Sequence, residues 1–343
     1  MDAESGRVLY AQNIHEQRLI ASITKLMTAL VAVERTEDLD REITVCPEWT
    51  GIEGSSIYLK ANEKISMRGL LYGLLLQSGN DAAAAIACHV AGDVEGFAAL
   101  MNDRAKELGM DDSSFTNPSG LNDENHYSTA YDMALLACAC LENEVVAEIC
   151  ATQSATVGNR TFYNHNKLLH RYDGCVGMKT GYTELAGRTL VSAATRNGQT
   201  LVCVTLNDGD DWNDHEKLLD FGFGSFPSQV LCTQGELFGA VKVVDSLLPS
   251  VPVIAAEQVA YPLGDGEKLE LAVEIAHTMQ APVFAGMPVG WAAWSLNGEI
   301  VAETELLCGG TAKLNRYEKL SFRERISKLL DRHTMAPNGA HLI

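Results

Sequence analysis

Residues 21–34 of the chain read ASITKLMTALVAVE. Apolar side chains lie on nearly all sides of this segment, a pattern typical of a helix that is buried all round. Ser22 and Lys25 stand three residues apart near its start, and residues at that spacing share one face of a helix. A lysine in an apolar helix is costly unless it is paired or neutral, and burial lowers its pKa. Lys25 is therefore a candidate base for a Ser22 nucleophile, although a single Ser-x-x-Lys also arises by chance.

Helical patterns continue through the first half of the chain. Helices are predicted over four further segments: 69–76, 81–91, 94–109 and 129–150. A polar loop is predicted at 116–128, and a strand over residues 7–10, which follow the turn pair Ser5-Gly6. These segments predict a helical cluster built around residues 21–34.

Strand patterns replace the helical ones near residue 188. The segments 188–196 and 200–206 are strand-like, and Asn197-Gly198 between them is a strong hairpin signal. Residues 1–225 therefore predict an α+β domain in which a helical cluster packs on an antiparallel sheet.

The remainder of the chain has a different residue pattern. Proline or glycine recurs through residues 226–310, and segments 268–276 and 299–307 alternate apolar and polar side chains, which predicts a small all-β domain of half-buried strands. A tail, 311–343, follows. Its part 311–333 holds seven Lys/Arg and three Asp/Glu, net +4.

Two patterns in this tail predict an amphipathic helix. Ser321 and Glu324 fit a capping box. Apolar residues also share one helical face, namely Phe322, Ile326, Leu329 and Leu330. We weigh a short helix packed on the β domain against an anchor at a membrane surface, in which the apolar face enters the headgroup region and the basic residues meet anionic lipid.

Composition excludes several classes of protein. The 343 residues are 46% hydrophobic, which rules out disorder over most of the length. The net charge of −19 argues against a nucleic-acid partner. The nine cysteines are scattered without metal-ligand spacing and are interpreted as small buried residues. No apolar run reaches about 18 residues, so no membrane-spanning helix is expected, and the first residues lack the features of a secretory signal.

Two more short motifs follow the Ser22 segment. Ser78-Gly79-Asn80 separates two apolar helical runs, where such residues ordinarily stop one helix and cap the next. Lys179-Thr180-Gly181 follows a glycine-containing turn and is otherwise an ordinary strand edge. Each motif has an unremarkable structural explanation when it is taken alone.

Taken in order, the three motifs resemble the S-x-x-K, S-D-N and K-T-G signature of class A β-lactamases and penicillin-binding proteins. The S-G-N form resembles the serine D-alanyl-D-alanine carboxypeptidases, peptidase family S11, which are low-molecular-mass penicillin-binding proteins. The similarity covers roughly residues 5–225. It includes ASITKLMTAL at 21–30, LLYGLLLQSGNDAAA at 70–84, FTNPSGL at 115–121, HYSTAYDM at 126–133, MKTGYTELAG at 178–187 and LLDFGF at 218–223.

The resemblance implies a transpeptidase-like fold with the three motifs around one cleft, and it implies their roles. Ser22 is the nucleophile that attacks the penultimate D-Ala and forms an acyl-enzyme, and Lys25 is its base. Ser78 relays the proton to the departing D-Ala amine. Asn80 positions Lys25 and the substrate amide, and Lys179 favours neutral Lys25 and supports the relay.

The resemblance also implies the groups that bind substrate. Thr180, in the Lys-Thr-Gly motif with Gly181, binds the terminal carboxylate. The backbone N–H groups of Ser22 and Tyr182 form the oxyanion hole. Some relatives carry an arginine before the third motif, whereas residues 164–169 here contain none. His165 or Lys167 substitutes for it, or Thr180 acts with Lys179 alone.

Several alternatives remain open in the sequence. A β-lactamase needs a glutamate in an E-x-x-x-N pattern, and the only approach to it between residues 80 and 178 is Glu107 to Asp111. A non-catalytic peptidoglycan-binding module would be expected to have lost a motif, whereas all three are intact. A DD-endopeptidase shares the same site. The acidic stretch 207–214 is interpreted as a solvated turn, with a divalent cation as the weaker alternative.

The family relationship carries expectations for partners and location. The substrates are pentapeptide stems of peptidoglycan, β-lactams are covalent inhibitors, and neither metal nor organic cofactor is expected. We expect the enzyme to act outside the cytoplasmic membrane, at the cell wall or at the outer face of that membrane, with possible surface contact through 311–333. In the family a signal peptide and a first sheet strand precede the S-G-x-x-L-Y segment, which here begins at residue 5, so we expect that they were trimmed or that the start was assigned late.

Overall fold

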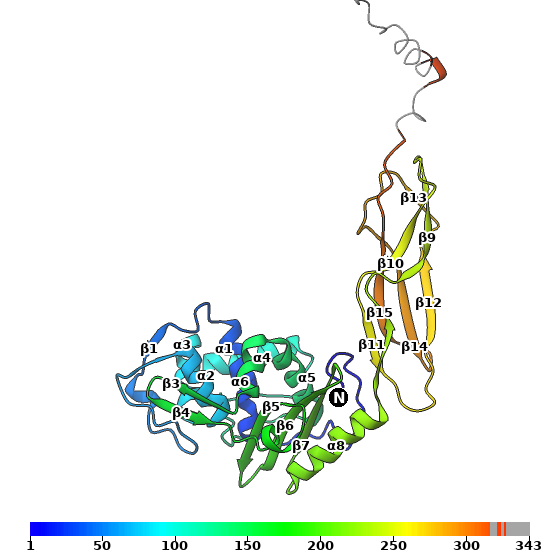
Figure 1. Cartoon of the computed structure of the whole chain (residues 1–343). Coiled ribbons are helices and arrows are strands. Elements are labelled where there is room, and N and C mark those ends of the chain that lie inside the picture. The colour runs from blue at the N-terminus through cyan, green and yellow to red at the C-terminus, as the bar shows by residue number, and fades with distance from the viewer. Residues whose placement is uncertain (316–320, 324–325, 327–343) are drawn as a thin grey trace, which may run out of the picture. The chain divides into compact units, whose positions relative to one another are not determined.

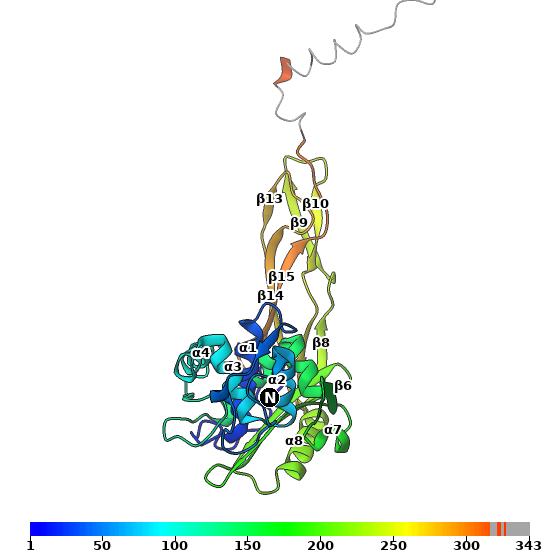
Figure 2. The ribbon, with the colours of Figure 1, turned by 90° about the vertical axis from the view of Figure 1, so that its left-hand side faces the viewer.

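The computed structural model describes residues 1–315, 321–323 and 326. Two compact units make up the chain, the first comprising Met1–Pro227 and the second beginning at Ser228 (Figures 1 and 2). Each unit has its own apolar core. The two are described separately below.

The first unit contains the predicted helical cluster. Its helices are η1 (Ala21–Thr24, a 3-10 turn), α1 (Lys25–Glu34), η2 (Pro47–Trp49, also 3-10), α2 (Met67–Leu76), α3 (Asn80–Ala91), α4 (Val94–Glu107), α5 (Ala130–Glu142), α6 (Glu144–Ala151), α7 (Leu168–Arg171) and α8 (Asp211–Ser225). Helix α1 is buried from Lys25 to Ala32, as its apolar sequence predicts. It therefore forms the centre of the cluster, in contact with α2 to α6.

A three-stranded antiparallel sheet supports this cluster. Its strands are β5 (Cys175–Thr183), β6 (Gly187–Arg196) and β7 (Gln199–Leu206), in that order. Alternate residues of β6 point to opposite faces. Val191 and Ala193 join the core under α1, whereas Leu190 and Ala194 join a second core with α8. The sheet thus lies between the helical cluster and α8, and β5, at its edge, is left open toward the site.

One local prediction for this unit is confirmed and two need correction. The β6–β7 hairpin turns at Asn197 and Gly198, both with φ in the left-handed region, as the Asn-Gly signal predicts. The predicted strand at 7–10 is wrong, because among the described residues the N-terminal segment pairs with the sheet only at Asp2, which bridges Leu201.

The second correction concerns 129–150, which forms two helices rather than one. Asn143 has an extended φ,ψ and its side chain accepts a bond from the Val146 N–H (3.1 Å), which caps α6 and ends α5. Two short hairpins complete the unit, β1 (Glu42–Thr44) with β2 (Lys64–Ser66) and β3 (Ser154–Val157) with β4 (Arg160–Tyr163).

The second unit is built from strands, as predicted. They are β8 (Ser228–Cys232), β9 (Leu237–Val244), β10 (Ser250–Ala255), β11 (Val259–Pro262), β12 (Glu270–Ile275), β13 (Thr278–Gln280), β14 (Pro288–Leu296) and β15 (Glu299–Cys308). Six of them form one sheet in the order β12-β14-β15-β10-β9-β13, and β11 pairs with β8. Segment 268–276 contains a strand as predicted, but the strand is not half-buried. β12 is a sheet edge, and its first five residues are all exposed. Most of the predicted tail helix lies outside the described residues.

Within the part of the chain that the structure describes, no single helix is long and apolar enough to cross a membrane. Helices α3 and α4 pass that test of length and composition only as a pair, and they are bent by 84° at their junction.

Separate cores lead to a first prediction, that a chain ending at Pro227 keeps its penicillin-binding chemistry. The larger core and the α8 core belong to residues before Pro227, so removal of the second unit exposes neither. We expect this shortened chain to be acylated by fluorescent penicillin at the rate of the full chain. A chain that gives the near-UV circular dichroism of a packed domain but is not acylated would show that the units are not independent.

Candidate active site

Ser22 lies in the 3-10 turn that leads into α1. The turn is held by the Thr24 hydroxyl, which donates to the Ala21 carbonyl at 2.8 Å. Ser22 is partly exposed, whereas Lys25, three residues later, is fully buried. The spacing therefore brings the two side chains together as predicted, with the serine toward solvent and the lysine beneath it.

Lys25 makes three hydrogen bonds through one nitrogen. Its Nζ donates to Ser22 Oγ at 2.9 Å, to Asn80 Oδ1 at 2.8 Å and to the Ser119 carbonyl at 2.7 Å. Burial holds the pKa of Lys25 well below its usual value of 10.5, and the nearby charge of Lys179 lowers it further, while Asp81 acts in the opposite direction. At a given pH, a larger fraction of Lys25 is therefore neutral than of an exposed lysine.

The three partners of Lys25 determine where its lone pair points once a proton is lost. Asn80 Oδ1 and the Ser119 carbonyl can only accept hydrogen bonds, so a neutral amine must donate both of its N–H groups to them. Ser22 Oγ is the one partner that can donate instead. The lone pair of neutral Lys25 therefore faces the Ser22 hydroxyl, which is the arrangement that a general base requires.

Both acceptors are themselves fixed in place. Asn80 is the first residue of α3, and its Nδ2 donates to the Glu53 carbonyl at 2.6 Å, so its Oδ1 is left for Lys25. The turn at Ser119 is fixed by Asn117, whose Oδ1 accepts from the N–H groups of Ser119 (3.1 Å) and Gly120 (2.8 Å).

Close packing between two loops requires glycine at position 120. Gly120 has φ of +81°, and a Cβ there would collide with the Ala21 carbonyl, next to Ser22. The loop that carries the Ser119 carbonyl is thereby packed against the turn that carries Ser22.

Lys179 supplies a second buried amine from strand β5. It is 1% exposed, and its Nζ donates to the carbonyl of Thr180 at 2.8 Å. Burial lowers the pKa of Lys179 to about 8, with Cys150 acting in the opposite direction. Lys179 is therefore largely charged at neutral pH, and this charge is one reason for the low pKa of Lys25.

Ser78 occupies the turn between α2 and α3, two residues before Asn80. It is buried, and its φ of +61° lies in the left-handed region. Among the described residues, none hydrogen-bonds to the Ser78 hydroxyl. The structure thus places Ser78 beside the Lys25 ligand Asn80 and leaves its hydroxyl available.

Strand β5 passes directly beside the Ser22 turn. A Cβ at Gly181 would stand 2.9 Å from the Ser22 nitrogen and 3.1 Å from the Ile23 nitrogen, so glycine permits this approach. Thr180 is half-buried and Tyr182 is 64% exposed, so both face an accessible edge. The predicted carboxylate-binding residue and oxyanion donor thus lie on the strand that passes beside Ser22.

His165, the other predicted carboxylate ligand, is exposed in the loop after β4. Its backbone N–H donates to the Leu76 carbonyl at the end of α2, at 3.3 Å. Burial lowers the pKa of His165, and the charge of Lys179 lowers it further, which places the imidazole near the third motif. No residue of this loop supplies an arginine.

A buried histidine that the sequence did not single out lies behind the turn. The Thr116 N–H donates to Nδ1 of His126 at 3.1 Å, so the ring proton must be on Nε2. Nε2 then donates to Thr24 Oγ1 at 2.8 Å, and Thr24 Oγ1 in turn donates to the Ala21 carbonyl. Neutral His126 therefore holds the turn that presents Ser22.

Two buried histidines predict how stability depends on pH. Burial lowers the pKa of His126 to about 4 and that of His215, which bridges Ser192 and Thr205, to about 3. The unfolded chain binds these protons near pH 6.5 and the folded chain does not, so stability is lost as pH falls from 6.5 toward 4.

For His126 this loss is on the order of 3 kcal/mol. Urea unfolding of the intact chain at a series of pH values measures it. A His126→Gln variant, which cannot be protonated in this range, should show a shallower pH dependence. An identical pH dependence in both proteins would contradict the assignment.

Two aspartates of the acidic stretch 207–214 form ion pairs with neighbouring basic side chains. Asp211 accepts from Arg188 (2.8 Å) and Asp214 pairs with Lys217 (2.8 Å) at the start of α8. In the described part of the chain, no group of three or more His, Cys, Asp or Glu residues is placed to hold a metal ion. All nine cysteines are described and free.

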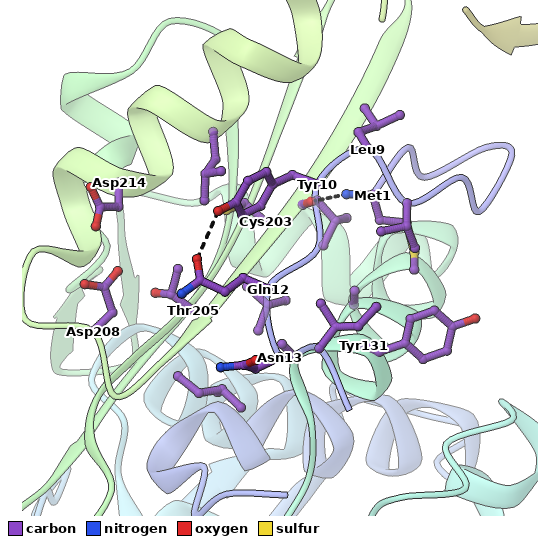
Figure 3. A pocket seen from close by; sticks show the side chains of 18 of the residues that line it. Met1, Leu9, Tyr10, Gln12, Asn13, Tyr131, Cys203, Thr205, Asp208 and Asp214 are labelled. Carbon is purple, nitrogen blue, oxygen red and sulfur yellow. Dashed lines mark hydrogen bonds between the residues drawn. The ribbon is translucent and has the colours of Figure 1, made fainter. Parts of the chain in front are cut away.

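One cavity of the catalytic unit is lined by residues other than Ser22 and its partners. It has a volume of about 650 Å³ and is bounded by the N-terminal segment, α5, β7 and α8 (Figure 3). Figure 3 shows the N-terminal Tyr10 and Gln12 side chains, joined by a hydrogen bond of 3.0 Å, on its wall. None of the predicted site residues lines it. The cavity therefore does not form part of the candidate active site.

Comparisons with known proteins agree with this geometry. Residues 1–210 match the D-alanyl-D-alanine carboxypeptidase family, and residues 226–313 match the C-terminal domain of penicillin-binding protein 5. The chain is 34% identical over 331 residues to D-alanyl-D-alanine carboxypeptidase DacC of Escherichia coli, covering 90% of this chain and 81% of that protein. It is 29% identical over 319 residues to DacF of Bacillus subtilis, covering 89% and 82%.

A solved structure shows the same architecture. Penicillin-binding protein 5 from Haemophilus influenzae matches with a TM-score of 0.76 at 28% identity, covering 91% of this chain and 96% of that chain. The similarity extends through both units of the chain.

Proposed function

Because the chain belongs to the D-alanyl-D-alanine carboxypeptidase family, peptidase S11, it is a serine-type D-Ala-D-Ala carboxypeptidase and a penicillin-binding protein, and we propose which of its residues carry out the reaction. The observation that supports the proposal best is the set of three bonds at Lys25 Nζ. It supports Ser22 as the nucleophile and Lys25 as the group that deprotonates it.

Acylation begins with proton transfer from Ser22 Oγ to neutral Lys25. Ser22 Oγ then attacks the carbonyl carbon of the penultimate D-Ala, and the carbonyl oxygen takes up negative charge. The backbone N–H groups of Ser22 and Tyr182 stabilise this oxyanion, and a single such donor typically contributes about 3 kcal/mol. The close approach of β5 to the Ser22 nitrogen supports this pairing.

Collapse of the intermediate breaks the peptide bond and needs a proton on the departing D-Ala amine. Ser78, whose hydroxyl is free beside Asn80, donates its proton to this amine and is reprotonated by the proton that Lys25 took from Ser22, and the charge of Lys179 supports this relay. Thr180 binds the terminal carboxylate, aided by Gly181, which lets β5 approach, and by His165 near Lys179. Water then attacks the acyl-enzyme and releases the shortened stem peptide.

Release of D-Ala from a soluble peptide that ends in D-Ala-D-Ala tests this function directly. We expect stoichiometric D-Ala from this substrate and slow or no cleavage of cross-linked muropeptide dimers. We also expect a penicilloyl-enzyme that persists for minutes, because the chain lacks a glutamate in the E-x-x-x-N pattern that β-lactamases use. Turnover of penicillin in less than a second, or a preference for cross-linked dimers, would contradict this assignment.

The site of action follows from the substrate. Peptidoglycan lies outside the cytoplasm, so we place the enzyme at the cell wall or at the outer face of the membrane. The net charge of +4 over residues 311–333 supports contact of this tail with anionic lipid, to which each Lys or Arg contributes about 1 kcal/mol.

A further inference from the structure

One end of the C-terminal unit is formed by three segments that are far apart in sequence. They are residues 244–249, from the last residue of β9 to the start of β10, residues 281–287 between β13 and β14, and residues 309–315 after β15 (Figure 1). We call these three segments together the tip. The β14–β15 turn at Asn297 and Gly298 lies at the opposite end of the same unit.

Backbone hydrogen bonds hold the three segments of the tip together. They join Ala281 N–H to the Val244 carbonyl (3.0 Å), Val283 and Ala312 to each other in both directions (2.9 Å each), and Asn315 N–H to the Asp245 carbonyl (2.7 Å). The tip is therefore an ordered surface.

Large apolar side chains project from this surface. Leu247 is 79% exposed, Leu248 is 51% exposed and Phe284 is 56% exposed. The turn that carries the two leucines is fixed by Ser246, whose Oγ accepts from the Leu248 N–H (3.2 Å) and donates to the Lys313 carbonyl (2.8 Å). Three large apolar groups on adjoining, fixed segments form a patch that water solvates poorly.

Charge is distributed unevenly over the same unit. Residues 228–315 contain ten acidic side chains, of which only Asp245 belongs to the tip. The nine others lie elsewhere in the unit: Glu236, Glu257, Asp265, Glu267, Glu270, Glu274, Glu299, Glu303 and Glu305. Asp245 accepts a hydrogen bond from Gln280 at 2.8 Å. An acidic domain thus has one end that is apolar and nearly free of negative charge.

The sequence that follows the tip is basic. Residues 316–333 contain six Lys/Arg and three Asp/Glu, and they begin directly after Asn315. An apolar surface on an otherwise acidic body, followed directly in the sequence by a basic segment, suits an anionic lipid bilayer. We propose that the tip itself enters the headgroup region, with Leu247, Leu248 and Phe284 as its inserting side chains. This inference rests on the proposed location of the enzyme at the outer face of the membrane.

Co-sedimentation of the full chain with phosphatidylglycerol–phosphatidylethanolamine vesicles tests the proposal. The tip variant carries Leu247→Ser, Leu248→Ser and Phe284→Ser. Its matched control carries Val230→Ser, Leu271→Ser and Ile300→Ser, three similarly exposed apolar residues (58%, 51% and 66%) outside the tip. We expect the partition coefficient of the tip variant to fall about tenfold or more, since burial of each large apolar side chain is favourable. The control should partition as the native chain does.

Salt separates the tip from the basic tail. High salt weakens the contribution of the tail, so the difference between tip variant and control should persist there. Equal partitioning of both variants, or no binding of the native chain to vesicles, would overturn the proposal. A different result would also overturn it, namely a tip variant that binds vesicles as the native chain does but no longer self-associates in sedimentation velocity. The tip would then contact a second copy of the chain.

Two further measurements keep the result interpretable. A milder variant, Leu247→Ser with Leu248→Ser, should lose part of the affinity if the triple variant unfolds. Fluorescent penicillin should label every variant at the native rate, because the tip lies outside the catalytic unit. If the native chain is not labelled by fluorescent penicillin, the proposed function is wrong. If it is labelled but does not bind vesicles, only the proposal for the tip is wrong.

Discussion

The Ser22→Ala variant should fold as the native chain does and show no covalent labelling by fluorescent penicillin. We propose Oγ of Ser22 as the atom that becomes acylated, so its removal leaves no attachment point, however well the ligand binds. Ser22 is partly exposed, and removal of its hydroxyl leaves Lys25 with two acceptors in place, so the loss of stability should be small. The expected fall in labelling therefore reflects chemistry rather than unfolding.

Gel fluorescence after incubation with the labelled penicillin measures this effect, and thermal unfolding checks the fold. Ser154→Ala is a matched control, because Ser154 is an exposed residue at the start of β3. Covalent labelling of the Ser22 variant at the native rate would refute the assignment of the nucleophile.

Removal of the base should have the second largest effect. Lys25→Ala is expected to slow acylation about 10²- to 10⁴-fold, the usual contribution of a general base. It also leaves the Asn80 and Ser119 oxygens without their donor, so some stability is lost as well. Lys25→Arg separates the two effects, because a guanidinium donates to these oxygens but does not become a base at neutral pH.

Stopped-flow acylation with a chromogenic β-lactam measures the rate of each variant, and urea unfolding measures its stability. We expect the arginine variant to be more stable than the alanine variant and equally slow. Near-native acylation by either variant would show that another group deprotonates Ser22.

The pH profile of the native enzyme provides an independent check on the same step. Acylation should rise with pH as Lys25 loses its proton, and the pKa of Lys25 lies well below 10.5. It should fall again near pH 8, because the pKa of Lys179 is about 8 and its charge is needed for the relay. Lys179→Ala should slow acylation by orders of magnitude and remove the falling limb.

The sequence predicts side-chain chemistry in this site better than it predicts backbone chemistry. Ser22, Lys25, Asn80 and Lys179 are recognisable from three short motifs taken together, although each motif alone is weak. The third ligand of Lys25 is the carbonyl of Ser119, and every residue has a carbonyl, so no side-chain pattern marks it. Its signal is the Asn-Pro-Ser-Gly turn, whose glycine is required by contact with Ala21.

Tertiary context explains the remaining differences. Residues 7–10 have the composition of a strand, but a strand needs a partner, and the described partner edge of β7 is bridged by Asp2 instead. The apolar pattern of 129–150 runs through Asn143, and only the cap bond to Val146 shows that the helix restarts there. His126 is one polar residue in a polar loop, and its role depends on burial beneath Thr24, which the loop sequence does not reveal.

The three bonds at Lys25 bring together a turn, the start of a helix and a loop that are separated by 55 and 94 residues along the chain. Such a centre exists only in molecules in which all three parts are folded. Covalent penicillin therefore counts native molecules as well as reporting their chemistry. A destabilising substitution far from the site should lower the final labelled fraction and leave the rate constant of the labelled molecules unchanged, whereas a substitution in the site should do the reverse. Stoichiometry and rate, recorded in one time course, thus distinguish a defect of folding from a defect of catalysis.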